Sequence, residues 1–374
     1  MTSTTATELA AGGAGLSVSG LSKTYGQRGE IRALDDFSLT FPAGQCTVLL
    51  GPSGCGKTTV LRSIAGLVTP DSGRITIGDQ VAFDHAAGHE EPPEERHLGM
   101  VFQSYALWPH MNVAEHIAYP LLTSGLAKTE IAQRVTAMLD WVGLGGMGNR
   151  FIHELSGGQQ QRVSLGRAMV GKPRAILFDE PLSNLDARLR ERMRMELLAL
   201  RQQAPFTSIY VTHDQLEAMT LGDRVVVMRA GRIEQMGSPE EIYRRPRTRF
   251  TAEFVGIPNL LDGRVRDISA AETVVDTALG PLRAVGWRRD RQTGTRCTVA
   301  VRPTLLGVSR GTVGAGQTEG HVIRTAFQGS SSVVLVDVAG AQLVIETLAE
   351  ERHEASTPVA VQPAQGAVFA LLDD

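Results

Sequence analysis

Hydrophobic and polar positions follow two different patterns along the chain. From about residue 16 to residue 256, short β-branched or apolar runs alternate with longer stretches of helical periodicity, which is typical of an α/β domain. Four of the runs are apolar throughout, as in strands buried on both faces of a parallel sheet, and they lie at 47–51, 175–180, 207–213 and 224–228. We expect these runs to be strands of the sheet core.

Two stretches carry an apolar stripe at helical spacing. The first predicts a helix from about residue 186 to residue 203, with a stripe formed by Leu185, Leu189, Met193, Leu197 and Leu200. The second stripe consists of Ile131, Val135, Met138, Leu139 and Val142. Because helical stripes usually bury one face of a helix, we expect both to pack against a core.

From residue 257 to residue 374 the pattern changes to short β-rich runs separated by Gly, Ser or Pro. No helical stripe interrupts these runs, so we expect a second domain that is all β. This part of the sequence holds no lysine and no cluster of histidine, cysteine and carboxylate residues. We therefore expect it to bind or pack rather than to catalyse.

Composition narrows the class of protein. The chain has 374 residues, of which 42% are hydrophobic and 21% charged, as in globular proteins of more than one domain. The formal net charge is −3, so the positive footprint of a nucleic-acid-binding protein is missing. Three cysteines indicate a reducing compartment and no disulfide framework. We expect residues 1–15 to form a disordered tail and no segment to span a membrane.

The strongest local motif is GPSGCGKTT, which matches G-x-x-x-x-G-K-[ST] between an apolar run and a helix-like stretch. In such a loop, glycines let backbone N–H groups surround phosphate oxygens, the lysine adds a positive charge and the hydroxyl binds Mg²⁺. A chance glycine-rich turn is the alternative, but only four lysines occur in the chain. We predict a nucleotide site formed by Gly51, Pro52, Ser53, Gly54, Cys55, Gly56, Lys57, Thr58 and Thr59.

Two further apolar runs end in residues suited to phosphate chemistry. The run at 175–180 ends in Asp179 and Glu180, and the carboxyl end of a parallel strand is where Mg²⁺ is held opposite a phosphate loop. We predict that Asp179 orders the magnesium and that Glu180 acts as base toward the attacking water. The run at 207–213 ends in His213, in a position to reach the γ-phosphate or this water.

The segment LSGGQQQR at 155–162 predicts the start of a helix. Ser156 and Gln159 have the spacing of a capping box, and Gly157 and Gly158 leave backbone N–H groups open to an anion. The chain would thus hold two phosphate-binding helix ends but one catalytic carboxylate. Our hypothesis is a homodimer in which two chains exchange these elements.

In these motifs the chain resembles the ATP-binding subunits of ABC transporters. The matching segments occur in order from about residue 16 onward: KTYG, GPSGCGKT, MVFQ, LSGGQQQR, ILFDE, SNLD and THD. The resemblance implies a P-loop NTPase fold at 16–256, with a parallel-sheet core, an antiparallel β subdomain and a helical subdomain at about 104–172. It implies an OB-like small barrel with a regulatory role at 257–374, and hydrolysis of ATP with Mg²⁺.

The same resemblance assigns roles to individual residues. Tyr25 would stack on adenine, Gln103 would bind Mg²⁺ and sense the γ-phosphate, and Asp186 would signal across the dimer. The catalytic set would consist of Lys57, Gln103, Glu180 and His213, with Mg²⁺ held by Thr58, Gln103 and Asp179. The residues that would close on ATP held by the opposite subunit are Ser156, Gly157, Gly158 and Gln159.

A narrower resemblance is to the ATPases of bacterial uptake systems for ferric iron, polyamines, phosphonates, sugars or glycerol phosphate. It is carried by residues 102–121, the run NLDARLRERMRMEL and the segment GRIEQMGSPEEIYRRPRTRFTAEFVGIPNLL. Such proteins work peripherally at the cytoplasmic face of the inner membrane with two permease subunits, and indirectly with an extracytoplasmic solute-binding protein. The groove for the permease would be lined by Tyr105, Leu107, Trp108, Pro109 and Met111, although core packing also explains some of these residues.

A soluble ABC ATPase that is not coupled to transport is the alternative. Such a protein would be expected to carry two tandem cassettes or a long coiled-coil insertion, whereas this chain has one set of motifs and no sustained heptads. A non-catalytic regulatory module would be expected to lack Lys57 or Glu180, and both are present.

Overall fold

The computed structural model describes residues 13–26, 30–269, 272–286, 292–311, 313–349, 351, 353–365, 367 and 369–372. The chain forms two compact units, Met1–Pro239 and Glu240–Asp374. This division comes earlier than the expected boundary at 256–257, so helix α9 (Arg249–Phe254) groups with the strand-rich unit, as does most of α8 (Pro239–Arg244). The expected disordered tail at 1–15 lies almost entirely outside the described residues.

The first unit is built on a six-stranded sheet in the order β11-β10-β3-β9-β8-β7. All neighbours in this sheet are parallel except β11, which pairs antiparallel with β10 at one edge. The four strands expected from the apolar runs are confirmed as β3, β8, β9 and β10. The strands are β3 (Cys46–Leu50), β7 (Leu98–Val101), β8 (Ala175–Asp179), β9 (Ser208–Thr212), β10 (Arg224–Arg229) and β11 (Arg232–Gly237).

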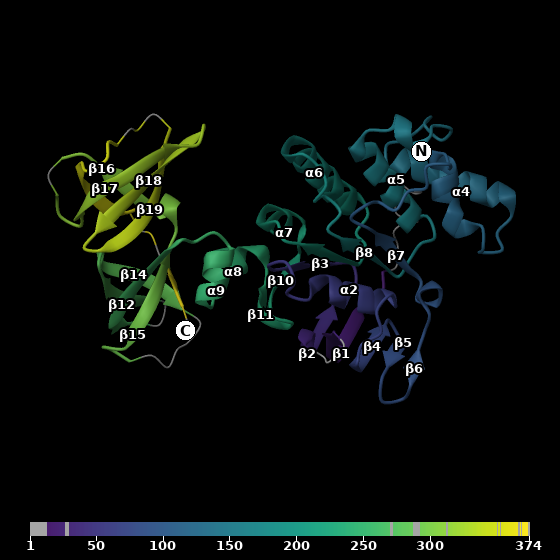
Figure 1. Cartoon of the computed structure of the whole chain (residues 1–374), viewed down its shortest axis with the longest axis horizontal. Helices are drawn as coiled ribbons and strands as arrows, with labels where there is room; N and C mark the ends of the chain where they lie inside the picture. The colour runs from purple at the N-terminus through teal and green to yellow at the C-terminus, as the bar shows by residue number, and fades with distance from the viewer. Residues whose placement is uncertain are drawn as a thin grey trace. The chain divides into compact units, whose positions relative to one another are not determined.

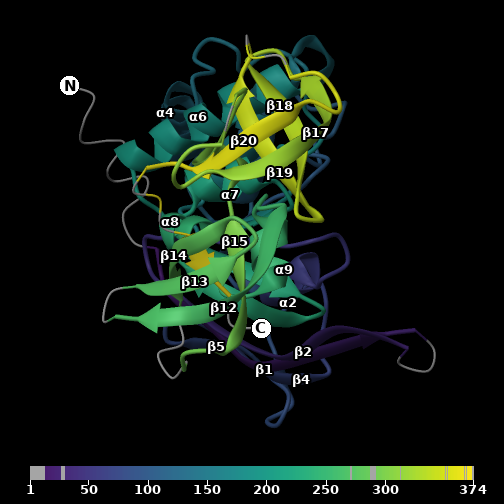
Figure 2. The same cartoon turned by 90° about the vertical axis from the view of Figure 1, so that its left-hand side faces the viewer.

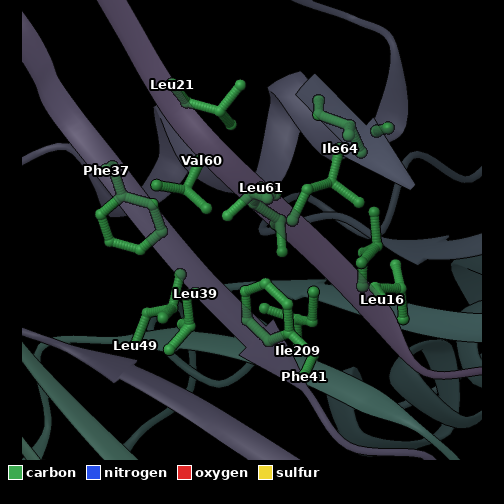
Figure 3. Close-up of a cluster of buried hydrophobic side chains, with 14 of the residues drawn as sticks. Leu16, Leu21, Phe37, Leu39, Phe41, Leu49, Val60, Leu61, Ile64 and Ile209 are labelled. Carbon is green, nitrogen blue, oxygen red and sulfur yellow. The ribbon is translucent and has the colours of Figure 1, made fainter. Parts of the chain in front are cut away.

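A second, antiparallel sheet has the order β2-β1-β4-β5-β6. Helix α2 (Lys57–Ala65) packs in the core between the two sheets, where Figure 3 shows Val60 and Leu61 among Phe37 of β2 and Leu49 of β3. The strands of this sheet are β1 (Leu16–Tyr25), β2 (Ile31–Phe41), β4 (Ser72–Ile77), β5 (Gln80–Asp84) and β6 (His89–Glu90). This core anchors the helix that follows the phosphate loop.

Helices gather beside the edge strand β7, in the stretch where a helical subdomain is expected (Figure 1). They are α3 (Val113–Ala118), the 3₁₀ turn η2 (Tyr119–Leu121), α4 (Lys128–Trp141), η3 (Ile152–Glu154) and α5 (Gly157–Met169). The predicted helix at 186–203 is α6 (Ala187–Gln203), capped by Asp186, and α7 (Gln215–Leu221) follows β9. No helix in the described part of the chain is long and apolar enough to cross a membrane.

The second unit confirms the expected small barrel and adds another sheet (Figure 2). The closed barrel consists of β12 (Asn259–Ile268), β13 (Thr273–Thr277), β14 (Gly280–Gly286), β15 (Arg296–Val301) and β21 (Phe369–Leu371). The sheet consists of β16 (Leu306–Ser309), β17 (Thr318–Phe327), β18 (Ser331–Val338), β19 (Ala341–Leu348) and β20 (Pro358–Pro363). Alternate residues of β18 point inward, so that barrel and sheet share one hydrophobic core.

Candidate functional site

Four neighbouring strands carry the predicted site residues at their carboxyl ends. The phosphate loop follows β3, His213 follows β9, Asp179 ends β8, and Gln103 comes shortly after β7. These strands are parallel and adjacent in the order β3-β9-β8-β7, so their carboxyl ends meet at one edge of the sheet. The sheet topology thus brings together residues that lie far apart in the sequence.

The phosphate loop depends on glycine where the backbone turns. Gly56 has a φ of 105°, which favours glycine, and a Cβ there would lie 2.3 Å from the carbonyl oxygen of Ala33. Helix α2 begins at the next residue, so its free N–H groups face the loop. The ammonium of Lys57, a residue only 4% exposed, donates to the carbonyl oxygens of Gly51 at 2.8 Å and Pro52 at 2.9 Å. Phosphate oxygens would accept stronger hydrogen bonds from this ammonium than the two carbonyl oxygens do.

Oxygen donors for a metal ion lie beside the loop. The Thr58 hydroxyl donates to Oδ1 of Asp179 at 3.2 Å, and Arg62 Nη2 lies 3.2 Å from Oδ2 of the same carboxylate. A hydroxyl and a carboxylate held together are the hard ligands that Mg²⁺ takes alongside water and phosphate, so these residues fit the ion. Gln103 is exposed after β7 at the same edge of the sheet, and its backbone carbonyl accepts a hydrogen bond from the Asn184 side chain at 3.0 Å.

Glu180 and His213 meet at the ends of neighbouring strands. Oε2 of Glu180 lies 3.2 Å from Nδ1 of His213. Glu180 has a φ of 47°, in the left-handed region that is costly for a residue other than glycine, and its N–H donates to the carbonyl of Val211 at 3.1 Å. Strain of this kind persists where the surroundings hold it, and it often marks functional sites. Here the strained residue is the one whose carboxylate lies against His213 at the carboxyl edge of the sheet.

A buried network supports the segment that carries His213. Oε2 of Glu217, a residue 2% exposed, accepts hydrogen bonds from Thr212 at 2.7 Å and from Tyr210 at 3.0 Å. Burial raises the pKa of the Glu217 carboxyl. The N–H of Asp214 in turn donates to the Thr212 hydroxyl at 2.9 Å. Our sequence analysis missed Glu217, whose available signal is its position three residues after the helix cap Asp214.

The start of α5 confirms the predicted capping box. The Gln159 N–H donates to the Ser156 hydroxyl at 3.4 Å, and the Ser156 N–H donates to the Gln159 side chain at 2.9 Å. A Cβ on Gly158 would lie 3.0 Å from Sδ of Met193 in α6. Glycine at this position therefore serves close helix packing, besides the anion access predicted from the sequence.

Two other predicted residues lie at the ends of elements. Tyr25 ends β1 with 40% of its surface exposed, and the Lys23 ammonium lies 5.7 Å from its ring centroid. Asp186 is exposed and caps α6 by accepting the Leu189 N–H at 2.9 Å. Both are accessible, as contact with a nucleotide or with another subunit requires.

A hollow of about 910 Å³ opens between β7 and the helices that follow it, and Trp108 contributes to its lining. The other predicted groove residues are not among those that line it. Tyr105 is buried, with Leu107 packed nearby, in a cluster with Leu182 and Leu185. Tyr105 thus follows the alternative of core packing, and its backbone is left-handed, with φ of 62°. Pro109 and Met111 likewise lie outside the lining.

Two side chains that our sequence analysis missed hold Trp108 in place. The backbone N–H of Trp108 donates to Nε2 of buried His116 at 2.8 Å, and the two rings stack with centroids 5.7 Å apart. The guanidinium of Arg167 in α5 lies 5.3 Å from the Trp108 ring centroid and donates to the Tyr105 carbonyl at 2.8 Å. Helix α5 is thereby tied to the wall of the hollow.

Comparison with known proteins agrees with this geometry. Residues 34–183 match the family described as ABC transporter. The chain is 44% identical to the spermidine/putrescine import ATP-binding protein PotA of Pseudomonas aeruginosa, over 86% of this chain and 87% of that protein. This chain belongs to the ABC transporter family. It is also 53% identical to the trehalose/maltose import ATP-binding protein MalK of Thermococcus litoralis, over 64% of this chain and 65% of that protein.

A solved structure supports the activity of this ABC ATPase. The ATP-binding cassette MJ0796, in a dimeric post-hydrolysis state bound to ADP and Pi, is 30% identical with a TM-score of 0.51. The match covers 60% of this chain and 98% of that one. The predicted resemblance to ABC transporter ATP-binding subunits is confirmed, and with it ATP binding and hydrolysis.

Proposed function

We propose that this ABC ATPase powers solute uptake as a head-to-tail homodimer at the cytoplasmic face of a bacterial inner membrane. It works with two permease subunits and, indirectly, with an extracytoplasmic solute-binding protein, and it binds no nucleic acid. The candidate solutes are ferric iron, polyamines, phosphonates, sugars and glycerol phosphate. The observation that carries the proposed chemistry is the Glu180–His213 contact at the same sheet edge as the phosphate loop.

The proposal gives each candidate site residue a task in ATP binding or hydrolysis. The nest from Gly51 to Thr59 and the Lys57 ammonium bind the triphosphate, and Tyr25 stacks on adenine. Thr58, Asp179 and Gln103 hold Mg²⁺, which when bound neutralises charge on the β- and γ-phosphates. Glu180 accepts a proton from the water that attacks the γ-phosphorus, and His213 donates a hydrogen bond toward the γ-phosphate.

The observation that supports the dimer is a second helix N-terminus with free backbone N–H groups. The N-terminus of α5 offers free backbone N–H groups at Gly157 and Gly158, beside the exposed Ser156. In the proposed dimer this segment, with Gln159, closes on ATP held by the partner chain. Asp186 faces the partner and signals across the interface. The hollow beside Trp108 receives a short helix of the permease, with the aromatic ring as its apolar contact.

The role of Glu180 is tested by Glu180→Gln. The amide keeps the size of the side chain but accepts no proton, so we expect steady-state phosphate release to fall about 100-fold or more while ATP still binds. Phosphate release and equilibrium dialysis with labelled ATP measure the two quantities. Glu191→Gln, on the exposed face of α6, is the matched control and should leave both unchanged. Near-normal turnover of Glu180→Gln would contradict the proposed base.

The role in transport is tested by purifying the full chain from its native membrane. We expect two integral-membrane permease subunits to copurify, and substitution of Trp108 by Ala to weaken their retention. Recovery of an active ATPase that binds no membrane protein at any step would instead favour the soluble alternative.

A further inference from the structure

Arg190 of α6 makes contacts that none of the sequence motifs predicts. Its guanidinium donates to three backbone carbonyls of the turn after β8, at distances of 3.3 Å to Leu182, 3.3 Å to Ser183 and 3.1 Å to Leu185. This turn begins with Glu180, whose own carbonyl accepts from the N–H and hydroxyl of Ser183 at 3.3 and 2.9 Å. Arg190 therefore fixes the shape of the turn that carries Glu180.

The other end of the guanidinium reaches the neighbouring strand end. Nη1 of Arg190 lies 3.6 Å from Oδ2 of Asp214, the residue directly after His213. Asp214 is itself fixed, since its Oδ1 accepts the Glu217 N–H at 3.0 Å as the cap of α7. Since His213 lies 3.2 Å from Glu180, the contacts close into a ring through Glu180, Ser183, Arg190, Asp214 and His213.

Only an arginine can make this set of contacts. The planar guanidinium presents five N–H donors in a rigid fork, whereas a lysine ammonium presents three donors at one point. The ion pair is partly exposed, at 30% for Arg190 and 23% for Asp214, so it adds little to stability. The guanidinium instead holds the turn after β8 at a fixed distance from the end of β9.

We propose that Arg190 is a positioning residue for ATP hydrolysis, because it joins the turn of Glu180 to the strand end of His213. The inference rests on the proposed roles of these two residues. The same turn runs into residues 183–186, which are expected to face the partner subunit.

The test compares Arg190→Gln and Arg190→Lys with Arg188→Gln, an exposed arginine on the same helix. Misplacement of a reacting group by about 1 Å costs on the order of 100-fold, so we expect kcat of Arg190→Gln to fall about 10- to 100-fold. KM for ATP should change less than about threefold, since the phosphate loop does not contact Arg190. Arg190→Lys keeps the charge but not the fork and should recover only part of the loss, while Arg188→Gln should behave as wild type.

Asp214→Asn provides the second arm, because asparagine still caps a helix but carries no charge. If Arg190 acts through Asp214, the double variant loses no more kcat than Arg190→Gln alone. An unchanged kcat in Arg190→Gln, or a loss of kcat that is matched by a higher KM and a lower unfolding midpoint, would overturn the proposal. Failure of the underlying function would show separately, as near-normal turnover of Glu180→Gln or His213→Ala.

Discussion

Cys55 shows how burial controls chemistry at the scale of one residue. It is 4% exposed inside the phosphate loop, and desolvation raises the pKa of its thiol despite the Lys57 ammonium 3.8 Å from Sγ. Because the thiolate is the reactive form, we expect iodoacetamide to label Cys55 slowly at pH 7 in the folded chain and rapidly in urea. The labelling rate of the folded chain should rise with pH. Mass spectrometry of the labelled peptides measures both rates.

Bound ATP should slow this labelling further, because the triphosphate would cover the loop. Cys297 is buried in the second unit and serves as the internal control, since its labelling should not respond to ATP. Equal labelling of Cys55 with and without ATP would contradict the predicted position of the nucleotide.

The sequence predicted most residues of the site but few of their partners. Lys57, Thr58 and Asp179 belong to motifs whose local spacing is tied to phosphate chemistry. Arg62, by contrast, contacts Asp179 across 117 positions, and a single arginine on a helix carries no motif. Arg190 was missed for the same reason. Partners of this kind follow from the order of the strands, which periodicity does not reveal.

At the scale of elements, patterns of burial predicted where strands and helices lie but not every side-chain direction. The apolar run at 175–180 became β8, and all five strand residues are buried as predicted. The side-chain directions in the aromatic segment after Gln103 were harder to predict, because an apolar residue type alone does not tell whether the side chain is buried or exposed. Tyr105 and Ala106 are consecutive left-handed residues, with φ of 62° and 48°, and in this turn Tyr105 is buried while Trp108 lines the hollow. Only the three-dimensional structure shows such a turn.

His116 makes the short helix α3 sensitive to pH. Its Nδ1 donates to the Asn112 carbonyl and its Nε2 accepts the Trp108 N–H, both at 2.8 Å, so the neutral ring fits and a protonated ring does not. Burial lowers the pKa of His116, and Arg167 and His110 lower it further, against opposing contributions from the Asn112 carbonyl and Glu115. Between this lowered pKa and the ordinary value of about 6.5, the unfolded chain binds more protons. The free energy of unfolding should therefore fall as the pH drops below about 6.5.

Urea unfolding at pH 7.5 and pH 5.5, followed by tryptophan fluorescence, measures this effect. In His116→Gln the amide can donate and accept without titrating, so the loss of stability between pH 7.5 and pH 5.5 should be smaller than in the wild type. Because pH 5.5 lies about one unit below the ordinary histidine pKa of about 6.5, the difference is at most about 1.4 kcal/mol. His85→Gln removes an exposed histidine that does not act on the pKa of His116, and it should keep the wild-type pH dependence. If His116→Gln loses as much stability between pH 7.5 and pH 5.5 as the wild type, then other groups cause the pH dependence.

At the scale of the whole molecule, the sequence predicted two domains, and the compact units divide the chain within α8, after Pro239. Strand alternation also predicted the β-rich character of the second unit. The small barrel was expected from the family resemblance, but nothing predicted the separate five-stranded sheet, because a period of two indicates which face is buried and not which strand is the neighbour. Long-range pairs such as β14 with β21 decide that arrangement.

Each large hydrophobic core lies within one unit, so we expect the two units to unfold in separate thermal transitions. All proposed contacts to nucleotide lie in the first unit, so ATP with Mg²⁺ should stabilise that unit alone. In the Glu180→Gln chain, ATP at about 100 times its Kd adds about 2.7 kcal/mol, which corresponds to about 5 to 10 °C for a unit of this size. Scanning calorimetry should show a higher midpoint temperature for the transition of the first unit and an unchanged midpoint for that of the second unit. Lys57→Ala should show both transitions, but ATP should no longer raise the midpoint of the first unit. An equal rise of both midpoints in Glu180→Gln would show that nucleotide binding stabilises the second unit as well.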